Sequence, residues 1–461
     1  MFTITLNLSA GADTPMYEQL YRYFVEEIHS GRLKTGEKLP SKRSLCAHLN
    51  ISQATVETAY GMLVSEGYLL SRPRSGYYVS DFAALGQGDA APPAAEEPPE
   101  TVPQRPYYDF STSAVDTSLF PYSSWAKLNK EIVYASPELL QRGERQGDAV
   151  LRQALCAFLE EYRGVKCAPS QIVVGAGMEY LTGLLLQLFP RETVFGMEDP
   201  GYASIYHTLV NNDRTLRFIP LDDGGMSLAA LRASDVDVAY LTPSHQFPMG
   251  ITTSAGRRSQ LLRWAAEEPG RYIIEDDYDS EFRYGSRPLP AMQSMDTAGR
   301  VIYIGTFSRS IAPSIRIAYL VLPPALLERY RAMFSHSLST VSRYEQAVMA
   351  RFLSEGFYTR YLRRVGNRYR ARRAALTAAL SAIDGVRILG SGGGLHFLLR
   401  NPRLSEEELL RRAAEKGIAL HGLSGYCRQC QPLSSTVVMG YGGLRDERIP
   451  QAAALLKEAW T

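Results

Sequence analysis

The chain has 461 residues, of which 45% are hydrophobic and 21% charged, and its formal net charge is +2. This length favours two or more domains, and the composition is that of an ordinary globular protein. The small net charge excludes a global attraction to nucleic acid or membrane surfaces, so DNA binding would need a local basic patch.

The lack of recognisable targeting signals and the cysteine usage predict a cytoplasmic protein. No apolar run reaches the length of a membrane span, and the N-terminal MFTITLNLSAGAD lacks the basic start and apolar core of a signal peptide. Five scattered cysteines fit a reducing compartment better than a disulfide scaffold. Cys427 and Cys430 form a single CxxC with only His421 nearby, so we interpret them as reduced thiols and predict no metal.

The first predicted helix spans residues 15–30, where apolar residues recur at a helical period. Ser41 is expected to cap a short helix that ends at Leu49, and Ser52 to cap a second helix that runs to about Glu66, with a turn at Asn50 between them. Two short helices joined by a tight turn predict a helix-turn-helix, whose second helix enters the major groove of DNA.

A hairpin wing is predicted next, with strands at 68–70 and 77–79 on either side of residues 72–76. Basic residues cluster before and on the first short helix and on this wing, where they suit phosphate contacts. The alternative is a small helical domain with a solvated basic face. The DNA contacts that we predict are Lys42, Arg43, Ser52, Gln53, Thr55, Arg72 and Arg74.

The string KLPSKRSLCAHLNISQATVETAYGMLVSEGYL closely resembles the GntR family of bacterial repressors. The resemblance spans nearly the whole N-terminal segment and implies double-stranded operator DNA as a partner. Family members usually place arginine at the start of the recognition helix, where this chain has Gln53. Since glutamine pairs with adenine and arginine favours guanine, the operator preference of relatives should not be transferred.

Residues 81–105, DFAALGQGDAAPPAAEEPPETVPQR, are rich in Ala, Pro, Glu and Gly and lack periodic apolar residues. Such a segment cannot bury enough surface to offset its ordering entropy, so we predict a linker. It would separate a winged helix-turn-helix domain at 1–80 from a second domain at 106–461.

The second domain alternates β-rich runs with helical stretches. We predict strands at 171–174, 193–197, 216–221, 236–241, 271–275, 301–305 and 316–322. Such continuous apolar runs are typical of an α/β fold with a mostly parallel sheet buried on both faces, whose ligands bind at the carboxyl ends of the strands. Polar motifs fall at those ends: GAG at 175–177, EDPGY at 198–202, TPSHQFPMG at 242–250, DDYD at 276–279 and TFSR at 306–309.

Four segments, EDPGY, TPSHQFPMG, EDDYDSEFRY and YIGTFSRSIAPSIRIAYLVLP, resemble the ligand domain of MocR/GabR-type regulators. These are GntR proteins fused to a fold-type I aminotransferase-like domain, and the resemblance covers roughly residues 107–461. It implies pyridoxal 5'-phosphate as the cofactor and a homodimer as the assembly.

The same resemblance implies a role for each matching position. Asp276 would pair with the pyridine nitrogen of the cofactor, Tyr278 would bond its ring hydroxyl, and Tyr202 would stack on its ring. The phosphate would be held by the backbone at Gly177 and Met178 and by the side chains of Thr306, Ser308 and Arg316. The alternatives are a structural aspartate in a network at a strand end and a surface arginine.

Arg309 stands where the resemblance implies the lysine that forms a Schiff base with the cofactor. A Schiff base needs a neutral amine, which arginine does not provide. Only eight of the 50 basic residues are lysines, and none lies between Lys166 and Lys416. Three interpretations stay open: natural drift, an introduced substitution that traps an inactive form, or a guanidinium that contacts a phosphate or carboxylate of a non-covalent ligand. We predict weakened non-covalent cofactor binding, or none, and no transaminase activity.

A second departure concerns the effector. Regulators of this type that sense 4-aminobutyrate carry an arginine two residues after the EDPGY tyrosine, where this chain has Ser204. Arg428 is a candidate effector contact from the C-terminal segment. We predict a transcription regulator that senses a small amine, amino acid or B6 vitamer. The alternatives are a pyridoxal phosphate-dependent aminotransferase with an accessory DNA-binding head and a ligand-free dimerisation scaffold.

Overall fold

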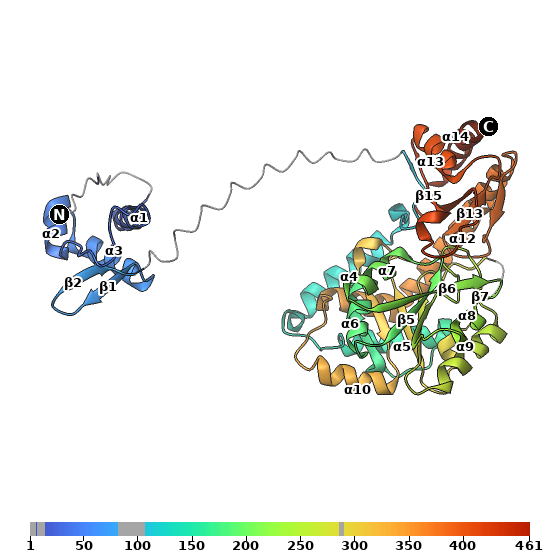
Figure 1. The fold of residues 1–461 in the computed structure, drawn as a ribbon, viewed down its shortest axis with the longest axis horizontal. Coiled ribbons are helices and arrows are strands. Elements are labelled where there is room, and N and C mark those ends of the chain that lie inside the picture. Colours follow the sequence, from blue (N-terminus) through green and yellow to red (C-terminus); the bar gives the residue numbers. More distant parts are fainter. Residues whose placement is uncertain (1–5, 7–13, 82–106, 285–289) are drawn as a thin grey trace. The chain divides into compact units, whose positions relative to one another are not determined.

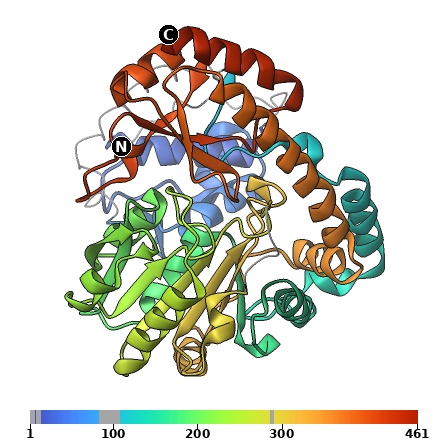
Figure 2. The same ribbon diagram turned by 90° about the vertical axis from the view of Figure 1, so that its right-hand side faces the viewer.

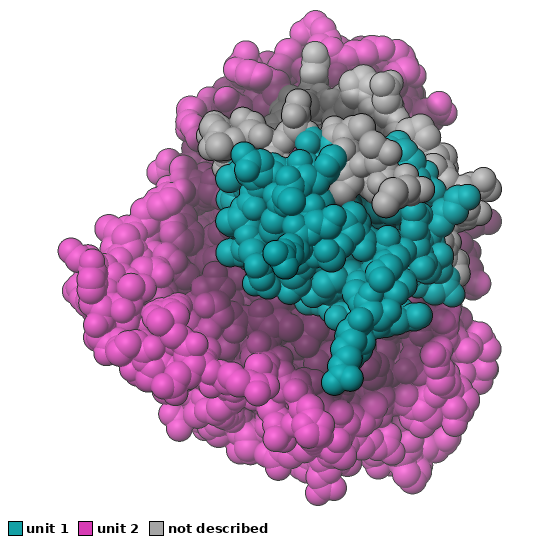
Figure 3. Space-filling view, turned by 90° about the vertical axis from the view of Figure 1, so that its left-hand side faces the viewer, with its two compact units in different colours: residues 1–103 teal, residues 104–461 magenta. Residues whose placement is uncertain are grey.

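The computed structural model describes residue 6 and residues 14–81, 107–284 and 290–461. The chain divides into two compact units, residues 1–103 and 104–461 (Figure 3). Apart from Asp81, the predicted linker at 81–105 lies outside the described residues, so the linker and the domain boundaries drawn from it stay predictions. Within the described ranges no helix combines the length and apolar character needed to cross a membrane.

The N-terminal unit contains three helices and a β-hairpin in its described part: α1 (Met16–His29), α2 (Lys42–Leu49), α3 (Gln53–Ser65), β1 (Leu69–Arg72) and β2 (Gly76–Val79) (Figure 1). The hydroxyl of Ser41 accepts a hydrogen bond from the Ser44 amide and caps α2, and Asn50 ends that helix in the left-handed region at φ 52°. Apolar side chains from all three helices and both strands, among them Phe24, Leu45 and Leu63, form one core. The predicted winged helix-turn-helix elements are present.

The larger unit is built on an eight-stranded sheet in the order β4-β11-β10-β9-β8-β5-β6-β7. Its strands are β4 (Ile172–Gly175), β5 (Val194–Asp199), β6 (Thr215–Asp222), β7 (Gly225–Met226), β8 (Val238–Leu241), β9 (Tyr272–Asp277), β10 (Val301–Thr306) and β11 (Ala318–Val321). Strands β5, β6, β8, β9 and β10 pair in parallel, so their carboxyl ends lie at one edge of the sheet. Sequence patterning therefore gave the correct α/β class with a mostly parallel sheet.

Helices cover both faces of this sheet (Figures 1 and 2). Along β8, Val238 and Tyr240 pack into a cluster with Leu185, whereas Ala239 and Leu241 pack into another with Trp264. This alternation explains why the strands read as continuous apolar runs. The helices of the unit are α4 (Tyr122–Ala135), α5 (Ala149–Arg163), α6 (Met178–Gln187), α7 (Ala203–Asn211), α8 (Leu228–Arg232), α9 (Ala255–Glu267), α10 (Pro324–Met333), α11 (Arg343–Ser354), α12 (Phe357–Ser381), α13 (Glu406–Glu415) and α14 (Ile449–Trp460).

A second sheet, absent from the sequence prediction, lies in the C-terminal segment, drawn orange to red in Figure 2. Its order is β12-β13-β16-β15, with β12 (Arg387–Leu389), β13 (His396–Arg400), β15 (His421–Gly422) and β16 (Thr436–Gly440). A separate short pair joins β3 (Tyr108–Asp109) to β14 (Ile418–Ala419) in parallel.

The predicted strand at 316–322 begins too early. Residues Pro313–Ile315 form a 3-10 turn, and Arg316 follows in the left-handed region at φ 51°, so β11 starts only at Ala318. Proline has no amide hydrogen to donate to a strand ladder, and a left-handed residue turns the chain out of the strand direction. Arg316 consequently lies before the strand that the sequence assigned to it.

Candidate functional site

The predicted recognition helix α3 begins with a cluster of polar side chains around the carboxylate of Glu57. The Lys42 ammonium lies 3.1 Å from Glu57 Oε1, and the Gln53 amide donates to the same oxygen at 3.1 Å. These hydrogen bonds, from Gln53 and then from Lys42, lower the pKa of Glu57. The three polar ends therefore lie together at the start of the second helix, which is the part that contacts bases in this motif.

The other predicted DNA contacts fall into two groups. Ser52 and Thr55 form the cap of α3, because the Ser52 hydroxyl accepts the Thr55 amide at 3.2 Å. Arg43, Arg72 and Arg74 are exposed, and the Arg72 guanidinium lies 4.7 Å from the centre of the Tyr78 ring. Exposed guanidinium groups beside the recognition helix and on the wing suit phosphate contacts.

A cavity of about 320 Å³ lies at the carboxyl ends of the parallel strands. Most of the residues that we predicted as cofactor contacts line it together: Met178, Tyr202, Asp276, Tyr278, Thr306, Ser308, Arg309 and Arg316. Gly177 is the N-cap of α6 directly behind Met178. Residues from four different strand ends thus meet at one site, as expected for ligands of open α/β sheets.

The carboxyl group of Asp276 lines the cavity. Its Oδ2 accepts a hydrogen bond from the Tyr240 hydroxyl at 2.6 Å, whereas its Oδ1 is buried and has no partner among the described residues. Burial, assisted by the nearby charge of Asp277, raises the pKa of Asp276 to about 7. A buried acceptor without a donor is destabilising, so this oxygen is suited to a donor supplied by a ligand.

Two hydroxyls and a guanidinium, those of Thr306, Ser308 and Arg316, line the same cavity. Thr306 Oγ1 donates to Ser308 Oγ at 3.1 Å, and the Arg316 guanidinium lies 2.7 Å from Glu179 Oε2. A β-carbon at Gly177 would lie 2.0 Å from Nη2 of Arg316, so only glycine leaves space for this guanidinium at the start of α6. A helix N-terminus with an arginine and two hydroxyls is a suitable site for a phosphate.

Tyr202 and Arg309 also line the cavity. The Tyr202 ring lies 4.1 Å from the Phe247 ring, and its hydroxyl accepts a hydrogen bond from Nη2 of Arg309. Burial raises the pKa of Tyr202, so its hydroxyl stays neutral. Arg309 lines the cavity and has no ion pair among the described residues.

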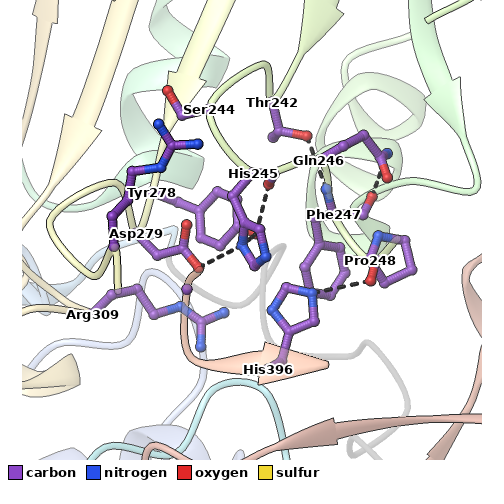
Figure 4. Close-up of polar contacts among 12 residues, drawn as sticks. Thr242, Ser244, His245, Gln246, Phe247, Pro248, Tyr278, Asp279, Arg309 and His396 are labelled. Carbon is purple, nitrogen blue, oxygen red and sulfur yellow. Dashed lines mark hydrogen bonds and ion pairs between the residues drawn. The ribbon is translucent and has the colours of Figure 1, made fainter. Parts of the chain in front are cut away.

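Tyr278 is held by the loop that carries the TPSHQFPMG motif (Figure 4). Its hydroxyl donates to the carbonyl of His245 at 2.9 Å, and Nδ1 of His245 lies 3.0 Å from Asp279 Oδ2. Nε2 of His396, on β13, donates to the Pro248 carbonyl at 3.0 Å, and burial lowers the pKa of His396 well below its usual range. This network fixes the Tyr278 ring beside the cavity.

Arg428, the candidate effector contact, does not line the cavity. Its guanidinium donates to the carbonyls of Gly425 and Cys427 at 3.2 Å and lies 4.5 Å from the centre of the Tyr206 ring. The backbone amides of residues 428–430 donate hydrogen bonds to the Asp199 carboxylate, and these bonds connect this segment to the end of β5. Both cysteines of the CxxC are free thiols.

Sequence reasoning missed several residues of the site: Glu179, Tyr240, His245, Phe247 and His396. The TPSHQFPMG motif pointed to His245 and Phe247, since it follows a strand, but gave no role to either. In the sequence Tyr240 is one of several apolar residues in a predicted strand, and His396 lies in a distant sheet. Neither position therefore indicated a role in the site.

Comparison with known proteins gives two family matches. The family described as bacterial regulatory proteins, gntR family, matches residues 16–79, and aminotransferase class I and II matches residues 107–432. The HTH-type transcriptional regulator YdeL of Bacillus subtilis is 39% identical over 99% of each chain. The probable rhizopine catabolism regulatory protein MocR of Rhizobium meliloti is 33% identical over 99% of this chain and 96% of its own.

Among solved structures, the multiple substrate aminotransferase of Thermococcus profundus superimposes with a TM-score of 0.69 at 25% identity. The match covers 76% of this chain and 90% of that enzyme. Both resemblances drawn from the sequence motifs, and the aminotransferase fold of the larger unit, are confirmed.

Proposed function

This chain belongs to the gntR family of bacterial regulatory proteins, as a DNA-binding transcription regulator that also carries an aminotransferase class I and II domain, and we propose that this second domain is its sensor. In this proposal the cavity binds pyridoxal 5'-phosphate or a related B6 vitamer reversibly, without covalent attachment, and ligand binding alters the affinity for operator DNA. The protein acts as a cytoplasmic homodimer and has no transaminase activity.

The free oxygen of Asp276 is the observation that carries the proposal. A protonated pyridine nitrogen is a donor that matches a buried carboxylate, and the hydroxyls of Thr306 and Ser308 with the Arg316 guanidinium match a phosphate. The cavity residues therefore fit pyridoxal phosphate at both ends. When bound, this group supplies an electron-accepting ring and an aldehyde that reacts with amines.

Arg309 supports regulation over catalysis. Within the described residues of the cavity no lysine amine is present, because the chain has none between Lys166 and Lys416. A guanidinium stays protonated and cannot act as the amine nucleophile. The chain's own residues can hold a cofactor, orient its ring and exclude water from it, but they lack the group that would bind it covalently.

The homodimer is proposed from the surface of the larger unit. Residues 122–150 expose five large apolar side chains: Tyr122, Val133, Tyr134, Leu140 and Val150. Apolar side chains concentrated in one exposed segment favour a protein–protein contact. Light scattering of the purified chain checks this assembly, and a monomer at micromolar concentration would contradict it.

Removing the charge of Asp276 is expected to weaken pyridoxal phosphate binding by roughly 10- to 100-fold, since a hydrogen bond to a charged group contributes about 1.5–3 kcal/mol. The measurement is calorimetric titration of wild type and Asp276→Asn, with Asp213→Asn at an exposed carboxylate as the control. DNA affinity of each protein is then measured with and without saturating pyridoxal phosphate. Equal affinity of wild type and Asp276→Asn for the ligand, or DNA binding that ignores the ligand, would refute the sensor.

Neutralising Glu179 is expected to strengthen binding of phosphate-bearing ligands several-fold. Glu179 is paired with Arg316 at 2.7 Å, and its carboxylate would repel a phosphate at the start of α6. Two like charges about 4 Å apart repel each other by roughly 1 kcal/mol in bulk water, and by more near a protein surface. Titration of inorganic phosphate into Glu179→Gln and into Glu328→Gln, an exposed control, tests this. Unchanged or weaker binding to Glu179→Gln would show that Glu179 serves mainly to orient Arg316.

A further inference from the structure

The guanidinium of Arg309 places a positive charge in the cavity, and this charge forms no ion pair with the described residues of the chain. Among the described residues its one hydrogen bond goes to the hydroxyl of Tyr202, which is neutral because burial raises its pKa. Of the nearby carboxylates, Asp279 lies 3.0 Å from His245, and Asp276 accepts the Tyr240 hydroxyl on Oδ2, while its Oδ1 is the oxygen that we propose for the ring nitrogen. The remaining N–H donors of Arg309 are thus available to a ligand in the cavity.

The order of substituents on the pyridine ring determines which part of a ligand Arg309 meets. Around the ring of a B6 vitamer the nitrogen, the methyl carbon, the hydroxyl carbon, carbon 4 and the phosphomethyl carbon follow one another. If the nitrogen faces Asp276 and the phosphate lies at Thr306, Ser308 and Arg316, carbon 4 lies between the ring hydroxyl and the phosphate. Arg309 follows Ser308 in the chain and lines the cavity together with Tyr278 (Figure 4), so in this orientation of the ligand its guanidinium would meet carbon 4.

Two neighbouring side chains, His396 and Tyr278, offer no negative charge that would hold a cation at carbon 4. His396 is neutral, since burial lowers its pKa well below its usual range, and its Nε2 is bonded to the Pro248 carbonyl. The Tyr278 hydroxyl is neutral as well, because burial raises its pKa, and it donates to the His245 carbonyl. With Asp276 Oδ1 bonded to the ring nitrogen and Asp279 bonded to His245, an ammonium at this position would meet the Arg309 guanidinium with no uncommitted carboxylate in the described part of the cavity to offset the repulsion.

We propose that Arg309 makes the cavity selective for phosphorylated pyridines with an acceptor oxygen on carbon 4, an aldehyde or a carboxylate, and that it rejects the aminomethyl form. This inference rests on the proposed function and names the chemical class of its ligand. The regulator would then distinguish the carbonyl form of the cofactor from its amine form by charge at a single position.

Three phosphorylated probes that differ only at carbon 4 test the selectivity: pyridoxal 5'-phosphate, 4'-deoxypyridoxine 5'-phosphate and pyridoxamine 5'-phosphate. They carry an aldehyde, a methyl group and an ammonium, so the methyl compound reports binding by the rest of the site. In calorimetric titration of the full-length wild type, affinity should be highest for the aldehyde probe, lower for the methyl probe and lowest for the ammonium probe. Each step should be on the order of tenfold, as expected for a charge-assisted contact and a like-charge repulsion in a partly buried site.

Two neutral variants provide the comparison. In Arg309→Gln and Arg309→Met the ratio of ammonium to methyl affinity should rise at least tenfold, while affinity for the methyl probe stays within a few-fold of wild type. Arg364→Gln, at an exposed guanidinium on α12, should leave the order unchanged.

The possible failures are distinct. Wild type that binds none of the three probes refutes the proposed function and this selectivity together. Wild type that binds all three equally, or variants that keep the wild-type order, refutes only the role of Arg309. If both variants lose the methyl probe as well, circular dichroism separates misfolding from a direct role. A folded variant without affinity for the methyl probe overturns the proposal, and a misfolded one leaves the wild-type order as the deciding result.

Discussion

Replacing Arg309 by lysine is expected to make the protein bind pyridoxal 5'-phosphate covalently and absorb visible light, whereas the wild type should do neither. The residues proposed to support the cofactor already line the cavity: Asp276 for the ring nitrogen, Tyr278 for the ring hydroxyl, and Thr306, Ser308 and Arg316 for the phosphate. A lysine amine becomes neutral more readily when it is buried, and only a neutral amine reacts with an aldehyde. This is the largest change that we predict from one residue.

The measurement combines an absorbance scan with borohydride reduction and peptide mass spectrometry, which locates any fixed adduct. The control is Arg316→Lys, which places a lysine at the phosphate end of the same cavity and should give no fixed adduct at that position. A colourless Arg309→Lys protein with ample cofactor would mean that the cavity no longer accepts the ring, and it would favour the dimerisation scaffold. A fixed adduct at position 309 of the wild type would disprove the chemical premise outright.

Removing the two basic side chains at the start of α2 is expected to weaken DNA binding to every sequence by about tenfold or more. Lys42 and Arg43 are placed beside the recognition helix, and charged hydrogen bonds of this kind contribute roughly 1.5–3 kcal/mol each. Fluorescence anisotropy of wild type and the double variant Lys42→Ala/Arg43→Ala with short duplexes of unrelated sequence measures this. The slope of log affinity against log salt should fall by roughly 0.9 for each lost phosphate contact.

The matched control, Arg363→Ala/Arg364→Ala, removes the same charge from exposed positions on α12, outside the proposed dimer surface, and should change neither affinity nor slope. Gln53→Ala should behave differently from both, because a base contact affects preference at one position and leaves the salt slope unchanged. Normal binding of the Lys42→Ala/Arg43→Ala protein at physiological salt would contradict the phosphate role of these residues.

Local sequence patterns were sufficient to predict much of the fold. Ser41 and Ser52 cap α2 and α3 as predicted, because a serine before a helix satisfies free amide groups whatever the rest of the chain does. The strands β5, β8, β9 and β10 were recognisable since both faces of each are buried, which requires continuous apolar runs. The predicted start of the strand at 316–322 was wrong, because Arg316 adopts a left-handed conformation after a turn that no apolar pattern in the sequence indicates.

The sequence by itself determined the family, the two kinds of domain and the residue types at the strand ends, including the arginine at position 309, because motifs of adjacent residues are readable without a fold. Only the tertiary structure decided which side chains meet. It left one Asp276 oxygen without a donor, placed Tyr240 on the other, paired Glu179 with Arg316 and brought His396 from a distant sheet beside His245. These contacts join residues up to 151 positions apart, as between His245 and His396. They arise from the packing of separate elements, so no periodicity along the chain predicts them.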